Sequence, residues 1–300
     1  MSNITVLGDG AWGRALAGLS TDCGHDTSIW SRKSPDTTHL RKADAIIVAL
    51  PAQAVATVLP TLGIDSMQAL IITAKGIDRS SNAFMHEVAR SISDKHHALI
   101  LSGPSFADDV SRKLPTAVTL ASSNLAVARQ WAKALSRPHF RIYASDDPLG
   151  VCIGGALKNV LAIAAGISDG KNFGASARAA LITRGFSELT RLGKAMGART
   201  ETLLGLSGLG DLLLTCSSPQ SRNYSFGKRL GEGQSVAQAL AAANGVVEGV
   251  YSAHAALQLA IQHTVTMPIT QAIYAIVENN AKPDDMIEAL LARPVGAEFL

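Results

Sequence analysis

The chain has 300 residues, of which 47% are hydrophobic and only 17% are charged. This length and composition predict a compact globular protein of two domains and exclude a disordered chain. The formal net charge is +3, and the basic residues are dispersed along the chain. Such a charge does not predict a nucleic-acid partner, but it suits an anionic ligand.

Three further features of the sequence bear on membrane insertion, location and metal binding. The longest apolar candidate for a membrane span, residues 45–62, is broken by Pro51 and Pro60, so we expect no membrane span. The first residues are typical of a β-strand and not of a signal peptide, which favours a cytoplasmic protein. The three cysteines are scattered and the histidines follow no metal-binding pattern, so no disulfide framework and no metal site are expected.

The first motif of the chain lies at residues 4–17. Four β-favouring residues run into G-x-G-x-x-G, and a helix-forming segment rich in Ala and Leu follows at once. In this order Gly8 permits a tight turn, Gly10 lets backbone N–H groups approach a pyrophosphate, and Gly13 lets the helix pack on the strand. The motif therefore predicts a dinucleotide site at a helix N-terminus, with a purely structural turn as the alternative.

The second predicted strand, residues 26–30, ends where an acidic residue would bind the ribose 2′-hydroxyl of NAD. Arg32 and Lys33 stand there instead, and no carboxylate lies between Asp26 and Asp36. Two cations would attract a 2′-phosphate, so the sequence favours NADPH over NADH. The alternative is that both are solvated loop charges.

Two continuous apolar runs, residues 45–50 and 69–74, are typical of strands in a parallel sheet covered on both faces. Lys75 follows the second run directly. Because ligands of open parallel sheets bind at the carboxyl ends of the strands, we expect Lys75 at the site and not merely in solvent.

A further strand at 98–101 ends in the small residues of segment 102–107. The Gly103 backbone and the Ser105 hydroxyl there suit a polar substrate, although a plain turn explains them equally well. A helix is expected at 82–93, and the alternation continues through 115–120, 126–135 and 140–144. This alternation predicts one doubly wound, mainly parallel α/β sheet.

From residue 147 onward no strand-like run appears and helical periodicity takes over, so we predict domains at 1–146 and 147–300. A helix over 149–166 is apolar nearly all round, as expected of a buried central helix. Lys158 lies within it, with Gly154 and Gly155 on the same face, where they would leave room for a ligand. Burial lowers the pKa of a lysine toward the range useful for proton transfer, which predicts a catalytic Lys158; the alternative is a side chain that reaches solvent.

Two more charged groups follow in the predicted helical domain. Arg184, Glu188 and Arg191, on a helix expected over 177–198, are typical of a solvated, self-paired face. Asp211 follows three glycines and begins an apolar helix. It either caps that helix, or it orients Lys158 or a substrate hydroxyl.

The segment Ser221-Arg222-Asn223 precedes a helix predicted over 224–230. A hydroxyl, a guanidinium and an amide at a helix N-terminus predict a phosphate site, because the Arg fork, the backbone N–H groups and the helix dipole all favour an anion. The alternative is a Ser N-cap beside a surface Arg. Further helices are expected from residue 246 to 262, from Pro268 and from Pro283.

Taken together, these motifs resemble those of the bacterial NAD(P)-dependent sn-glycerol-3-phosphate dehydrogenases over nearly the whole chain. The resemblance rests on GDGAWG (8–13), TAKG (73–76), SGPSFA (102–107), GGALKNVLAIAAGISDG (154–170), GLGD (208–211), QSRN (220–223) and VVEG (246–249). It implies reduction of dihydroxyacetone phosphate to sn-glycerol 3-phosphate, the precursor of glycerophospholipids. It also implies an N-terminal Rossmann domain joined to an all-helical substrate domain.

The resemblance also implies roles for matching residues. Lys158 is similar to the catalytic proton donor and acceptor, with Lys75 and Asp211 beside the reacting carbon. Gly103 and Ser105 match substrate contacts, and the substrate phosphate is matched by Ser221, Arg222 and Asn223. Cofactor contacts are matched by Ala11, Trp12, Arg32, Lys75, Ala107, Arg222, Val246 and Glu248.

The chain departs from the family pattern in one place. Family members usually carry a longer segment, with an N-x-x-Y-L-P-like motif, where this chain has only residues 31–44. We therefore expect a different wall at the adenine and nicotinamide edges.

Two rival functions stay open, and one assembly is expected. The rivals are a related two-domain dehydrogenase of the 6-phosphogluconate or 3-hydroxyisobutyrate type, and a non-catalytic NADPH sensor. The phosphate cradle at 220–223 argues against a hydroxyisobutyrate substrate, and a sensor needs neither catalytic lysine. Apolar helical faces in the second half favour a homodimer.

Overall fold

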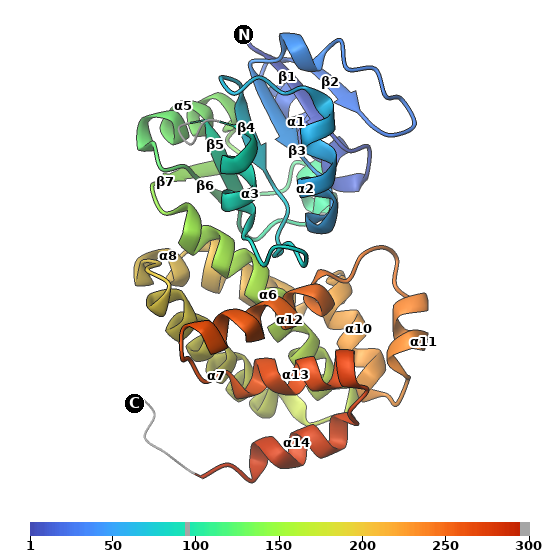
Figure 1. The fold of residues 1–300 in the computed structure, drawn as a ribbon. Coiled ribbons are helices and arrows are strands. Elements are labelled where there is room, and N and C mark those ends of the chain that lie inside the picture. Colours follow the sequence, from blue (N-terminus) through green and yellow to red (C-terminus); the bar gives the residue numbers. More distant parts are fainter. Residues whose placement is uncertain (94–96, 295–300) are drawn as a thin grey trace.

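The structure is a computed structural model that describes residues 1–93 and 97–294. Its N-terminal half is built on one sheet of seven strands in the order β2-β1-β3-β4-β5-β6-β7 (Figure 1). The strands are β1 (Asn3–Leu7), β2 (Asp26–Trp30), β3 (Ala45–Val48), β4 (Ala69–Ile72), β5 (Ala98–Ser102), β6 (Thr116–Ala121) and β7 (Phe140–Ser145). Only the β5–β6 pair is antiparallel among these strands. The predicted doubly wound, mainly parallel sheet is confirmed.

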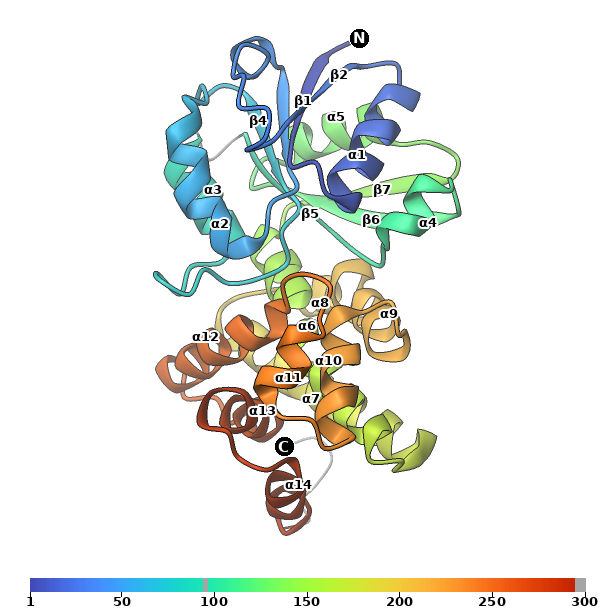
Figure 2. The ribbon, with the colours of Figure 1, turned by 90° about the vertical axis from the view of Figure 1, so that its right-hand side faces the viewer.

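Helices cover both faces of this sheet, as Figure 2 shows. One face packs against α1 (Ala11–Asp22), α4 (Ala107–Ser111) and α5 (Leu125–Leu135). The other face packs against α2 (Ala52–Val58), the short turn η2 (Leu59–Leu62) and α3 (Met85–Ile92). Strands β3 and β4 end two residues earlier than the apolar runs suggest, so residues 49–50 and 73–74 lie past the strand ends, at the edge where ligands of such sheets bind.

The second half of the described chain contains helices and no strands. They are α6 (Pro148–Gly170), α7 (Gly174–Ala195), α8 (Thr200–Leu204), η3 (Leu206–Gly210), α9 (Asp211–Ser217), α10 (Arg222–Gly231), α11 (Val236–Ala241), α12 (Glu248–Gln262), α13 (Pro268–Asn279) and α14 (Pro283–Leu291). The change from strands to helices falls between Ser145 and Pro148. The division into domains at residue 147 stays a prediction, and residues 295–300 of the second range lie outside the described residues.

Helix α6 is the centre of the helical half. It begins at Pro148, and the preceding Asp147 accepts a hydrogen bond from Gly150 N at 2.8 Å. A Cβ on Gly166 would lie 2.1 Å from Tyr224 O, and one on Gly227 would lie 2.1 Å from Ile163 O. Glycine at these positions therefore lets α6 and α10 approach more closely than any larger residue permits.

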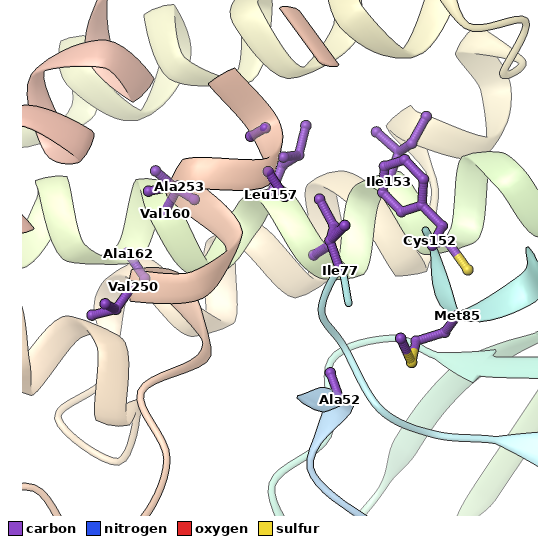
Figure 3. Packing of buried hydrophobic residues seen from close by; sticks show 14 of the residues in the cluster. Ala52, Ile77, Met85, Cys152, Ile153, Leu157, Val160, Ala162, Val250 and Ala253 are labelled. Atoms are coloured by element: carbon purple, nitrogen blue, oxygen red, sulfur yellow. The ribbon is translucent and has the colours of Figure 1, made fainter. Parts of the chain in front are cut away.

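The hydrophobic core runs without a break from the sheet into the helices. Figure 3 shows Cys152, Ile153, Leu157 and Val160 of α6 beside residues of α12 and of the sheet half, among them Ile77. These side chains are buried. The packing on both sides fixes α6, and with it Lys158, relative to the strand ends.

Helix α6 also corrects one expectation about membranes. It is 23 residues long with a mean hydropathy of 1.7 in its most apolar window, so by length and composition it could cross a bilayer. The expectation that residues 45–62 are the longest apolar candidate is therefore wrong. The whole of that window is buried against the rest of the protein, as in the core helix of a folded domain.

The charged face predicted on α7 is wrong for Glu188, which is only 2% exposed. Its Oε1 accepts from Ile269 N at 2.7 Å, and its Oε2 accepts from Thr270 N and Thr270 Oγ1, both at 3.1 Å. The first N–H groups of a helix have no partner within it, and Glu188 supplies one for α13 from a neighbouring helix. The i, i+4 spacing alone does not reveal this longer-range contact.

Candidate active site

The glycine motif folds as predicted, into a strand, a tight turn and a helix. Gly8 has φ +114°, and its N–H donates to Trp30 O at 2.8 Å. A Cβ on Gly13 would lie 1.9 Å from Gly8 O, whereas one on Gly10 would meet no atom within 4 Å. Within residues 1–93 and 97–294, no side chain caps the N-terminus of α1. The open space at Gly10 and the uncapped helix end fit the pyrophosphate of a dinucleotide.

Three more predicted cofactor residues lie close to this turn. Trp12 Nε1 donates to Thr73 Oγ1 at 3.0 Å, which ties the indole to the residue that follows β4. Trp12 and Ala107, the first residue of α4, both pack against the core on the α1 side of the sheet. Ala11, the first residue of α1, is exposed. These positions border the carboxyl ends of the central strands.

Arg32 and Lys33 lie at the tip of a tight turn directly after β2. Ser34 N donates to Ser31 O at 3.0 Å, which closes the turn, and both cationic side chains are exposed. Trp30, two residues before Arg32, is bonded to Gly8. The turn therefore starts beside the glycine motif, on the side where a ribose is expected.

The centre of the site is one buried carboxylate between two lysines. Asp211, 1% exposed at the start of α9, accepts from Lys75 Nζ at 2.8 Å through Oδ2 and from Lys158 Nζ through Oδ1. Lys75 also donates to Gly103 O at 2.7 Å. The strand end of β4 and the middle of α6 thus meet at Asp211, although the three residues are far apart in sequence.

Burial in this cluster lowers the pKa of Lys158 to about 8. Desolvation is the main cause; the negative charge of Asp211 opposes it, and the positive charge of Lys75 adds to it. Lys158 is therefore an ammonium at neutral pH, close to the point where it releases its proton. Such a group is suited to general acid–base catalysis.

The sequence did not single out Thr215 or the side-chain role of Asn159. Thr215 Oγ1 accepts from Lys158 Nζ at 2.8 Å, and it lies four residues after Asp211 on the same face of α9. Asn159 Nδ2 donates to Lys75 O at 2.8 Å. The i, i+4 spacing from Asp211 is the sequence signal for Thr215, whereas nothing local marks the contact of Asn159.

The two glycines on α6 play a different part from the one expected. A Cβ on Gly154 would lie 2.6 Å from Ser207 O, and one on Gly155 would lie 2.8 Å from Ser102 Oγ. Protein atoms therefore occupy the space that the sequence left for a ligand. These glycines let η3 and β5 pack closely on α6 beside Lys158.

The segment after β5 places its backbone next to Lys75. Gly103 has φ +147°, and a Cβ there would lie 2.8 Å from Val118 Cα. Gly103 O accepts from Lys75 and also from Ser105 Oγ, at 3.0 Å. Only glycine fits this backbone, and the segment stands at the same strand edge as Lys75.

The predicted phosphate residues begin α10. Ser221 Oγ accepts from Tyr224 N at 3.2 Å, so Ser221 is the N-cap of the helix. Arg222 is exposed. Asn223 Nδ2 donates to Asn159 Oδ1 at 3.0 Å, and its Oδ1 accepts from Gly249 N at 2.9 Å. Both ends of this amide have protein partners, which connects α6, α10 and α12.

Val246 and Glu248 stand before and at the start of α12. Glu248 Oε1 accepts from Ala52 N at 3.0 Å, across to the start of α2. Its Oε2 is buried and has no hydrogen-bond partner in the part of the chain that the structure describes. Burial raises the pKa of Glu248, and the nearby Arg222 opposes this shift. A Cβ on Gly245 would lie 2.9 Å from Arg222 Nη1, so Arg222 lies against the segment that carries Val246.

No three His, Cys, Asp or Glu side chains in residues 1–93 and 97–294 are arranged to hold a metal ion. The groups at the site are instead a glycine turn, two lysines on a buried carboxylate, and a helix N-terminus beside Arg222. This set suits an anionic dinucleotide and a phosphorylated substrate.

Comparison with known proteins decides the family. The C-terminal model of NAD-dependent glycerol-3-phosphate dehydrogenase matches residues 147–288, and the N-terminal model matches residues 3–42 and 34–128. The chain belongs to the NAD-dependent glycerol-3-phosphate dehydrogenase family.

Full-length relatives agree with this membership of the glycerol-3-phosphate dehydrogenase family. The chain is 46% identical to glycerol-3-phosphate dehydrogenase [NAD(P)+] of Parvibaculum lavamentivorans, covering 98% of both chains. It is 42% identical to the protein of the same name from Brucella ovis, covering 99% of both. A crystal structure of glycerol-3-phosphate dehydrogenase from Coxiella burnetii, 35% identical, matches with a TM-score of 0.91 over 97% of this chain and 99% of that one.

Proposed function

We propose that this protein reduces dihydroxyacetone phosphate to sn-glycerol 3-phosphate with NAD(P)H, in a reversible reaction. The observation that carries the proposal is the buried Asp211 bonded to one lysine from each half of the molecule. This arrangement places a titratable ammonium, Lys158, beside a strand end where ligands of such sheets bind. The proposed product places the enzyme at the entry to glycerophospholipid synthesis.

Proton transfer in this proposal belongs to Lys158. When bound, the reduced nicotinamide supplies the hydride for the C2 carbonyl of the substrate. Lys158 donates the proton to the carbonyl oxygen as negative charge develops there. Because the pKa of Lys158 is about 8, its ammonium serves reduction at neutral pH and its amine serves alcohol oxidation at higher pH.

The neighbours of Lys158 have supporting roles. Lys75 stabilises the negative charge that develops on the substrate oxygen, and this stabilisation is strongest in a site that excludes water. Asp211 holds both ammonium groups, and Thr215 supplies Lys158 with a second acceptor. The two lysines are thereby held in place before the substrate binds.

The substrate phosphate is assigned to the start of α10. Arg222 supplies a charged fork there, and the backbone N–H groups and dipole of the helix favour an anion. Ser221 and Asn223 frame this end, while Gly103 and Ser105 approach the substrate from the strand side. The protein partners of Ser221 and Asn223 support a role for both residues in shaping the phosphate site.

The cofactor is assigned to the glycine turn. Gly8, Gly10 and Gly13 shape the pyrophosphate site, and Ala11, Trp12, Ala107, Val246 and Glu248 line the rest, with Lys75 and Arg222 near the nicotinamide. Arg32 and Lys33 pair with a 2′-phosphate, which favours NADPH over NADH. The unpartnered Glu248 Oε2 supports a polar ligand at the start of α12.

Gly10→Ala tests the pyrophosphate site without disturbing the fold. A Cβ at Gly10 meets no protein atom within 4 Å, so we expect an unchanged melting temperature. The methyl group would occupy space that the pyrophosphate needs, and NADPH affinity should fall by about tenfold or more. Gly18→Ala is the matched control. Gly18 lies within α1, the helix that Gly10 precedes, and a Cβ there also meets no atom within 4 Å. Equal NADPH affinity in the Gly10→Ala and Gly18→Ala proteins would reject this site.

A panel of substrates tests the reaction itself. We expect oxidation of NADPH with dihydroxyacetone phosphate, a slower reaction with NADH, and no reduction of NADP+ with 6-phosphogluconate or 3-hydroxyisobutyrate. Turnover of either hydroxy acid in preference to glycerol 3-phosphate would support the rival dehydrogenases. Tight NADPH binding with no turnover of any substrate would support the sensor.

A homodimer and a cytoplasmic location remain part of this proposal. Support for the dimer comes from a groove of about 1220 Å³, lined largely by apolar residues of α6, α7, α13 and α14. Phe173 at its rim is 47% exposed. Sedimentation equilibrium of the purified protein distinguishes a dimer from a monomer.

A further inference from the structure

The connection between β2 and β3 contains no α-helix, which is unusual for a parallel sheet. In the strand order β2-β1-β3, the chain must cross β1 between these two strands. A crossover between parallel strands usually contains a helix. Here residues 31–44 contain only the three-residue turn η1 (Leu40–Lys42).

The comparisons locate a missing segment in this connection. The N-terminal family model matches in two stretches, 3–42 and 34–128, so the match breaks within residues 34–42. The alignment with the Parvibaculum protein extends over 325 residues, although this chain has 300. The relatives therefore have residues that this chain lacks, and the break places such residues within 34–42, the segment that follows Lys33.

The apolar core under this connection is packed without that segment, although Trp30 Nε1 is buried there with no hydrogen-bond partner among the described residues. Leu40 and Ala43 are 1% and 5% exposed and pack in the same cluster as Trp30. Gln68 Nε2 donates to both Leu40 O and Ala43 O, at 2.6 Å each. The short connection thus covers the sheet, and Gln68 satisfies two of its carbonyl groups. The effect of the shortening therefore falls on the exposed edge beside β2.

At that edge the chain presents positive charge and little apolar surface. The turn at 31–34 bears Arg32 and Lys33, both exposed, and residues 34–36 after it are exposed as well. An adenine ring needs an apolar or planar surface to be covered, whereas a 2′-phosphate needs only cations within reach. This edge therefore has the cations that the phosphate needs, whereas its described residues 31–36 offer only the Arg32 guanidinium and the Pro35 ring to cover the base.

We propose that the shortened β2–β3 connection leaves the adenine of bound NADP(H) open to solvent and makes the 2′-phosphate, held by Arg32 and Lys33, the main point of attachment at this end. The inference rests on the proposed cofactor site. It predicts a cofactor affinity that depends on salt more steeply than in a site that encloses the base, because exposed charge pairs are screened.

Fluorescence of 1,N6-etheno-NADP+ bound to the intact protein tests this directly. Acrylamide is the quencher, because a neutral molecule is not attracted by Arg32 and Lys33. Quenching is collisional, so we expect a bimolecular quenching constant for the bound base within about threefold of that for free ethenoadenosine. A bound base quenched more than about tenfold less efficiently than the free one would show an enclosed adenine and overturn the proposal.

Charge variants test the second half of the proposal. Arg32→Ala with Lys33→Ala should weaken etheno-NADP+ binding by about tenfold or more and leave etheno-NAD+ binding nearly unchanged. Arg41→Ala with Lys42→Ala removes the same charge from the same connection, but at the amino ends of β1 and β3, where Asn3 Nδ2 donates to Lys42 O. This control should bind both cofactors normally. Equal losses for the two cofactors in the Arg32 and Lys33 variant would refute the role of the 2′-phosphate.

Binding of etheno-NADP+ distinguishes failure of the proposed cofactor site from failure of the open-adenine proposal. Absence of any etheno-NADP+ binding to the folded protein would reject the cofactor site itself, and the inference with it. Binding with a shielded base would reject the open adenine alone and leave the proposed function intact.

Discussion

Replacing Lys158 by methionine should lower the turnover number for dihydroxyacetone phosphate reduction by about 10³-fold or more, since general acid catalysis alone contributes about 10²–10⁴-fold. Methionine has nearly the same length and fits the apolar surroundings of α6, so the fold should persist. Asp211 keeps Lys75 as its partner in this variant. The affinity for NADPH should change little, because the glycine turn is untouched. The measurements are initial rates at saturating substrate and fluorescence titration with NADPH.

Lys171→Met provides the matched control. Lys171 is the residue that follows α6, and it pairs with Asp284 near the surface. The same chemical change there should leave turnover within about twofold of the wild type, as for most surface substitutions away from a site. A Lys158→Met protein that reduces dihydroxyacetone phosphate at nearly the normal rate would disprove the assignment of the proton donor.

Asp211→Asn should move the pH dependence of reduction to lower pH. The charge of Asp211 raises the pKa of Lys158, while burial and Lys75 lower it. Without the carboxylate the main raising effects are lost, so the pKa of Lys158 falls below about 8 and less of the ammonium form is present at neutral pH. The rate at pH 7.5 should fall by about tenfold or more and recover partly in more acidic buffer, since one pKa unit changes the protonated fraction up to tenfold.

The pH profile separates this electrostatic role from a structural one. A variant that is merely misfolded loses activity equally at all pH values, whereas loss of the charge displaces the profile. Asp169→Asn is the control. Asp169 is a carboxylate on α6, the helix that carries Lys158, and it pairs with Arg178 and Tyr224 instead. Its profile should coincide with that of the wild type. An unshifted profile for Asp211→Asn would contradict the pairing of Asp211 with Lys158 in the working enzyme.

Local sequence patterns were sufficient to predict the sheet, the glycine turn and the central helix. Gly8 and Gly13 act through backbone sterics within a few residues, so their spacing alone indicates the turn. The apolar runs that became β3 and β4 likewise reflect burial on both faces of a parallel sheet. Lys75 was placed at the strand edge because the carboxyl ends of parallel strands share one edge.

The contacts between distant segments could not be predicted in the same way. Glu188 appeared to be a solvated charge, because i, i+4 spacing describes one helix and not the N-terminus of α13 that it reaches. The space beside Gly154 and Gly155 appeared to be ligand space, because the sequence does not show that η3 and β5 pack there. Asp211 had two possible roles until its contacts with Lys75 and Lys158 were known.

The most direct test of the account is the pH dependence of kcat/KM for the wild-type protein, measured in both directions with NADPH and dihydroxyacetone phosphate and with NADP+ and sn-glycerol 3-phosphate. If Lys158 transfers the proton, reduction falls as pH rises through about 8, whereas oxidation rises over the same range. Profiles that change in the same sense for both directions, or that are flat across this range, would contradict proton transfer by Lys158.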